Sequence, residues 1–198
     1  MVKPFVVDGQ VTSEHPNQSI PGVVFRLFTH EPSFLTYGED GNGPPEAAGY
    51  HTLFDIGTGN AKLLVKGVTL GFGLLILALC RLRTDGPAGT RIGLRLAAEW
   101  SLILLGMLLL SERTWKHHAV TLVLPFLVLT TTAITAASQR MRWGCGLALG
   151  AVAILMFGQS VLAEHMQDLA LVYGTHTLAF LIATAGIVAV LVSERMRK

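Results

Sequence analysis

The stretch AVTLVLPFLVLTTTAITAA, residues 119–137, contains no Asp, Glu, Lys or Arg. A helix that crosses the hydrocarbon core of a bilayer needs about 20 mainly apolar residues, so this stretch is long enough to span a membrane. Residues 144–163 and 169–192 are also apolar and free of charge. Two weaker segments, residues 63–80 and 94–110, carry charges only near their start, where long side chains can reach the interface.

The composition of the whole chain fits this interpretation. Charged residues make up 14% of the chain and hydrophobic residues 51%, whereas soluble domains carry about 25% charged residues. Five buried core helices in series would need a polar exterior that the chain lacks. We therefore predict an all-α integral membrane protein, with about five transmembrane helices in residues 61–198. An extracytoplasmic loop segment is predicted to precede them in residues 1–60.

Lys and Arg are distributed unevenly between the two sets of predicted loops. The loop after the first span holds four arginines, the loop after the third holds two, and the C-terminal tail holds two arginines and a lysine. Cytoplasmic loops carry the excess of Lys and Arg. We therefore expect a multi-pass protein of the plasma or inner membrane, with its C-terminus cytoplasmic and residues 1–60 outside. Residues 1–10 lack the pattern of a signal peptide, so we expect the C-terminal part of a longer polytopic protein.

The N-terminal segment contains one recognisable helix. The stretch IPGVVFRLF predicts a short amphipathic helix near residues 18–29. Ser19 or Asn17 can cap its first turn, and Pro21 is tolerated there. Its apolar residues predict that it lies in the interface plane or packs on the bundle. Further along, the sequence GEDGNGPP in residues 38–45 predicts a turn-rich loop.

A polar knot, SERTWKHH in residues 111–118, separates two apolar runs. It combines an acid, two permanent cations, an indole and two imidazoles at a predicted membrane rim. Arg offers a planar fork for phosphate and Lys a point charge, and His can donate to a phosphoryl oxygen. The knot therefore suits an anionic lipid headgroup. The alternative is an interface anchor, for which Trp with Lys or Arg is the usual composition.

Other polar residues have simpler interpretations. Adjacent histidines such as His117 and His118 project about 100° apart on a helix and rarely bind one metal ion together, so no metal site is expected. His176 lies in mid-span, and a hydrogen bond to a neighbouring helix is favoured over a functional role. Arg95 and Glu99 are four residues apart and are expected to pair.

Two segments resemble motifs of the glycosyltransferase 87 family. They are NQSI at residues 17–20, followed by Arg26, and the polar knot with the Pro-containing apolar run after it. The resemblance covers the C-terminal half of that family and implies the C-terminal part of a GT-C-type bundle. It implies an integral membrane hexosyltransferase that takes its sugar, often mannose, from a polyprenyl phosphate on the outer membrane face. The acceptor would be a lipid or a glycan, and no further cofactor is implied.

The resemblance and the chemistry of the knot together suggest roles for individual residues. The acidic catalytic residue of GT-C enzymes usually follows the first span, so we expect it upstream of this chain. The competing hypotheses are a non-catalytic half-enzyme that binds lipid or a partner, such as a separate N-terminal half, and a small transporter subunit. No nucleic-acid partner is expected. The donor phosphate would be bound by Arg113, Lys116, His117, His118 and Arg26, and the site would be lined by Asn17, Gln18 and Trp115.

Overall fold

The computed structural model describes residues 11–36, 46–80 and 93–196, with side chains up to Ser193. The turn-rich loop predicted for residues 38–45 and most of the first arginine-rich loop lie outside this part. The helices are α2 (Ile20–Phe28), α3 (Gly57–Cys80), α4 (Gly93–Leu110), α5 (Val123–Thr135), α6 (Gln139–Phe157), α7 (Glu164–Val172) and α8 (Thr175–Met196). Two 3₁₀ helices, η1 (Lys116–Leu122) and η2 (Gly158–Val161), and an antiparallel pair of strands, β1 (Phe34–Thr36) and β2 (Glu46–Gly49), complete the described chain.

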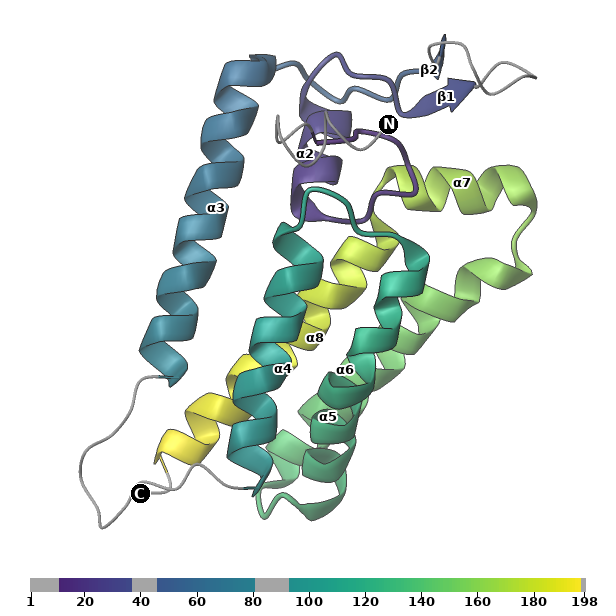
Figure 1. Ribbon diagram of the computed structural model, residues 1–198. Helices are drawn as coiled ribbons and strands as arrows, with labels where there is room; N and C mark the ends of the chain where they lie inside the picture. The colour runs from purple at the N-terminus through teal and green to yellow at the C-terminus, as the bar shows by residue number, and fades with distance from the viewer. Residues whose placement is uncertain (1–10, 37–45, 81–92, 197–198) are drawn as a thin grey trace.

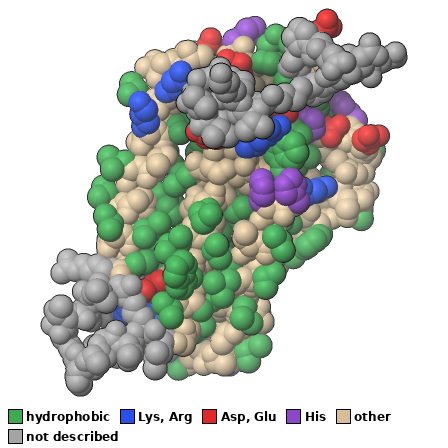
Figure 2. Space-filling model, in the orientation of Figure 1, with side chains coloured by type: hydrophobic (Ala, Val, Ile, Leu, Met, Phe, Trp, Pro, Cys, Tyr) green, Lys and Arg blue, Asp and Glu red, His purple; other side chains and the backbone are tan. Residues whose placement is uncertain are grey.

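Five helical segments are long and apolar enough to cross a membrane, so the prediction of an all-α multi-pass membrane protein is confirmed. Hydrophobic side chains cover the visible face of the bundle, whereas most charged and histidine side chains gather toward one end (Figure 2). The five segments are Gly57–Cys80, Gly93–Leu110, Lys116–Thr135, Gln139–Val161 and Thr175–Ser193.

Four of these segments form the bundle core. Helices α4, α5, α6 and α8 pack against one another around fully buried side chains such as Leu105, Leu129 and Ile187. Helix α3 stands at the side of the bundle and reaches past the end of α4 to lie beside α2 (Figure 1). Its Phe72 ring rests on Gly106 of α4, where an added Cβ would lie 2.7 Å from the ring. Helix α3 is therefore held at two levels, by α2 and by α4.

The short helix predicted near residues 18–29 is confirmed as α2. Ser19 is its N-cap, and the Ser19 hydroxyl accepts a hydrogen bond from the Gly22 N–H at 3.1 Å. Helix α2 packs on the bundle through Val24 and Phe25, which form a small apolar cluster with Ala61 of α3. Of the two placements expected for this helix, packing on the bundle is the observed one.

The fifth span begins later than predicted. The apolar run of residues 169–192 is broken at Gly174, whose φ of 75° is readily adopted only by glycine. Residues before the break belong to α7, which lies across the end of the bundle (Figure 1), and α8 begins at Thr175. The break was not predicted because both sides of it are apolar.

The described elements divide between two ends of the molecule. Helix α2, the hairpin, the polar knot and α7 lie at one end, which we call the rim (Figure 1). The turn between α5 and α6, with Arg140 and Arg142 close to it, lies at the opposite end, where α8 also terminates. The two predicted sides of the membrane therefore correspond to two ends of the fold. Which end faces the cytoplasm stays a prediction.

Candidate functional site

Asn17 joins the N-terminal segment to the polar knot. Its Nδ2 donates to the carbonyl oxygens of Thr12 at 2.8 Å and Glu112 at 2.9 Å, and its Oδ1 accepts from the N–H of Thr114 at 2.9 Å. The main chain adds a bond from the Gln18 N–H to the Thr114 carbonyl at 2.7 Å. The two segments that carry the family resemblance are therefore in direct contact.

Gln18 bridges the break between α7 and α8. Its Nε2 donates to the Leu171 carbonyl at 2.8 Å, and its Oε1 accepts from the His176 N–H at 3.2 Å. Helix ends leave carbonyl and N–H groups without intrahelical partners. The Gln18 side chain thus provides a hydrogen-bond partner for a carbonyl at the end of α7 and for an N–H at the start of α8.

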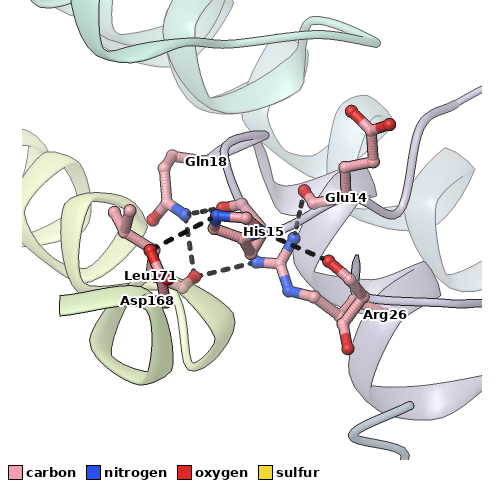
Figure 3. A network of polar contacts seen from close by, with 7 residues as sticks. Glu14, His15, Gln18, Arg26, Asp168 and Leu171 are labelled. Carbon is pink, nitrogen blue, oxygen red and sulfur yellow. Dashed lines mark hydrogen bonds and ion pairs between the residues drawn. The ribbon is translucent and has the colours of Figure 1, made fainter. Parts of the chain in front are cut away.

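Arg26 is fully buried and is held by main-chain carbonyls. Its Nε donates to Val172 at 2.8 Å, and its Nη2 donates to Leu171 at 3.2 Å (Figure 3). Both acceptors lie in the last turn of α7. Its Nη1 donates to the carbonyls of Ser13, Glu14 and Asn17. The C-terminal end of a helix carries partial negative charge, which stabilises the cation. Burial lowers the pKa of Arg26 to about 10, so it stays charged at neutral pH.

We call Asn17, Gln18 and Arg26 the clamp. Their exposed fractions are 0%, 1% and 0%. Each side chain is engaged by the protein itself, so the clamp does not present a surface to a ligand. This differs from the expectation that Arg26 contacts the donor phosphate and that Asn17 and Gln18 line the site. The clamp lies behind the knot and positions it.

His15 adds a second link between the N-terminal segment and α7. Its Nε2 lies 3.6 Å from Asp168 Oδ1, and its ring packs on Phe34 with 4.5 Å between centroids. Burial lowers the pKa of His15, and the Asp168 carboxylate opposes that effect only in part. Because the unfolded chain binds this proton more readily, acidification below about pH 6.5 destabilises the fold.

The cationic part of the knot is exposed. Lys116, His117 and His118 all reach solvent in the first turn of η1. The Nδ1 of His118 accepts a hydrogen bond from the Trp115 N–H at 3.0 Å, so the ring proton is on Nε2. The His117 and His118 rings touch, with centroids 4.3 Å apart, and the Arg113 guanidinium lies 4.2 Å from the Trp115 ring centroid. Five of the predicted site residues therefore form one short surface segment.

A cavity of about 740 Å³ lies beside the knot, between α2, α3 and the end of α4. Lys62 and Lys66 of α3 line it from one side, and Glu31 and Glu112 line it from the other elements. Glu112 belongs to the knot, whereas Lys62, Lys66 and Glu31 were not among the predicted site residues. The available signal was the spacing of the two lysines, four residues apart and therefore on one face of a helix. Of the two, only Lys66 was interpreted, as a charge that reaches the interface.

Two predictions about single residues are confirmed. Arg95 Nε lies 3.1 Å from Glu99 Oε1, as expected for a pair four residues apart. His176 is hydrogen-bonded through Nε2 to Gln159 of η2, a neighbouring element. Among residues 11–36, 46–80 and 93–196, no three His, Cys, Asp or Glu side chains are grouped so that they could hold a metal ion.

Comparisons with protein-family models, with curated proteins and with solved structures find no match to this chain. The resemblance to glycosyltransferase 87 therefore stays a prediction that depends on the two segments described above.

Proposed function

We propose that the chain is the C-terminal part of a GT-C-type membrane hexosyltransferase, and that the knot holds the phosphate of a polyprenyl-phosphate sugar. In this proposal the protein lies in the plasma or inner membrane with the rim outside. The donor tail would lie in the bilayer and the phosphate would lie at the level of Lys116, His117 and His118.

One observation carries the proposal. The segment at residues 17–20 and the knot are far apart in sequence, yet Asn17 bonds directly to Glu112 and Thr114. Two motifs of one site are expected to meet in space, and unrelated motifs have no reason to do so. The contact supports a shared origin with the family. In this proposal the clamp supports the site and the knot is the binding surface.

The chemistry of the exposed knot suits a lipid phosphate. Lys116 supplies a charge, and the Nε2–H of His118 supplies a neutral donor. When a sugar is transferred, the polyprenyl phosphate leaves as an anion, and donors fixed near it stabilise that charge. An acceptor hydroxyl would lose its proton to a carboxylate, which the resemblance assigns to sequence upstream of this chain.

Binding of undecaprenyl phosphate to the full chain in lipid nanodiscs tests the proposal. We expect Lys116→Gln and His118→Gln each to weaken binding about tenfold, the effect of losing one charge-assisted hydrogen bond to the phosphate. Arg140→Gln, an exposed cation at the opposite end of the bundle, is the matched control. Unchanged binding in both knot variants would overturn the proposal.

A transfer assay separates the enzyme from its main competitor. With polyprenyl-phosphate mannose and a glycan acceptor, the chain joined to its upstream sequence should transfer the sugar, and Lys116→Gln should lower turnover about a hundredfold. Binding of the polyprenyl phosphate without transfer would favour the non-catalytic lipid-binding half-enzyme instead.

A further inference from the structure

The cavity between α2, α3 and α4 is a built amphipathic site at the membrane rim. Its apolar side is formed by Phe25, Val65 and Leu110, and its volume of about 740 Å³ is in the range of small-molecule pockets, about 300–1,000 Å³. Deeper in the bundle α3 and α4 close on each other where Phe72 rests on Gly106. This contact lies outside the lining of the cavity, on the side toward the middle of the bundle.

The cavity carries both signs of charge, and its charges are not paired with each other. Lys62, Lys66 and Glu112 are exposed, and Glu31 is partly exposed. Within the described residues none of the four side chains makes an ion pair or a hydrogen bond. Two cations and two anions thus face one space without neutralising each other.

The depth of the lysines places the cavity at the level of lipid headgroups. Before Lys66, α3 carries polar residues, and after it residues 67–80 contain no charge. Lysines at such a boundary extend to the phosphates of the bilayer. Leu110, at the membrane-rim end of α4, lines the same cavity.

We infer that this cavity binds the headgroup of an aminophospholipid, with the phosphate on Lys62 and Lys66 and the primary ammonium on Glu112 and Glu31. Both halves of the headgroup then meet the opposite charge. A purely anionic headgroup would satisfy the lysines but would bring its charge to the two carboxylates. A quaternary ammonium could not donate hydrogen bonds to the carboxylates. This inference does not depend on the proposed transferase activity.

Mass spectrometry of the detergent-solubilised full chain, counting bound lipid, tests the inference. The probes are phosphatidylethanolamine, phosphatidylglycerol and phosphatidylcholine with the same acyl chains. We expect the first to bind most tightly. The double variant Lys62→Gln/Lys66→Gln should weaken binding of all three at least tenfold, because each loses its phosphate contacts. Arg140→Gln should leave binding unchanged.

A substitution of Glu112 tests which headgroup the cavity prefers. Glu112→Gln should weaken phosphatidylethanolamine about tenfold and leave phosphatidylglycerol unchanged or tighter, whereas Glu164→Gln on exposed α7 should change neither. Equal or tighter binding of phosphatidylglycerol by the unaltered chain, or loss of neither lipid in the lysine variant, would overturn the inference. The side chains of Lys62, Lys66 and Glu112 are exposed, so these variants are expected to fold. Unchanged melting temperatures would check this.

Discussion

Arg26 brings a permanent charge into a site that water does not reach. Burying an ion is unfavourable by several kcal/mol unless hydrogen bonds compensate for lost water. Here the compensation comes from carbonyl dipoles, two of them at the end of α7. The planar fork of arginine can donate in several directions at once, which a lysine ammonium on a flexible stem does not reproduce.

Arg26→Lys is therefore expected to destabilise the protein although it keeps the charge. Several carbonyls would lose their donor, and we expect a loss of about 2–4 kcal/mol. Thermal unfolding in detergent measures the effect, with the exposed Arg140→Lys as control. A melting temperature equal to that of the unaltered chain would show that the clamp contributes little to stability.

The partners of Arg26 explain why its role was not predicted. Its α7 acceptors are 145 and 146 residues away in the sequence, and they are main-chain carbonyls, which any residue type supplies. Arg95 and Glu99 were predicted correctly because both members of the pair are charged and lie four residues apart. An interaction between two charged side chains can be predicted from sequence, whereas an interaction with main-chain carbonyls cannot, because every residue type carries the same carbonyl group.

At the scale of elements, the break between α7 and α8 shapes the rim. Helix α7 lies across the end of the bundle, and the break redirects the chain into the membrane span of α8 (Figure 1). The break also leaves the Leu171 and Val172 carbonyls free to accept hydrogen bonds from the clamp. Gly174 permits this through its positive φ and through its lack of a side chain, since an added Cβ would lie 2.9 Å from Val23 Cγ2.

Gly174→Ala is expected to lower stability by about 1–3 kcal/mol, because it adds backbone strain and a contact with α2. Gly150→Ala in α6 is the matched control, since an added Cβ there meets no atom within 4 Å. Thermal unfolding of both variants makes the comparison. Equal shifts in the two proteins would contradict the role given to Gly174.

The elements differ in how well they could be predicted. Helix α2 was found because Ser19 and Pro21 mark its start, and the long spans were found from apolar length. The hairpin was missed because β1 and β2 are three and four residues long, and β2 is Glu-Ala-Ala-Gly, which has low strand propensity. Long apolar helices can be predicted from composition, whereas short strands depend on their tertiary contacts.

For the molecule as a whole, the fold separates the rim from the opposite end, where α6 begins with Arg140 and Arg142 in its first turn. Helix α7, with exposed Glu164, lies at the rim, and Arg140 lies at the other end. The distribution of Lys and Arg predicts that the rim is outside. The sequence could predict this separation because charge bias acts over whole loops and does not depend on side-chain packing.

Labelling with a membrane-impermeant maleimide tests the orientation. In a chain with Cys80→Ser and Cys145→Ala, we expect Glu164→Cys to react in intact cells and Arg140→Cys to react only after permeabilisation. The reverse pattern would place the rim in the cytoplasm and would contradict an outer site for a lipid-linked sugar.

The clamp also constrains the order in which the protein can be completed during synthesis. Asn17 and Arg26 leave the ribosome before any of the five spans, whereas Leu171, Val172 and His176 leave it after four of them. Until α7 is made, the Arg26 cation lacks two of its carbonyl acceptors. The clamp can therefore form completely only late in synthesis. In a nascent chain that stops before α7, the Arg26 guanidinium would lack these two hydrogen-bond acceptors.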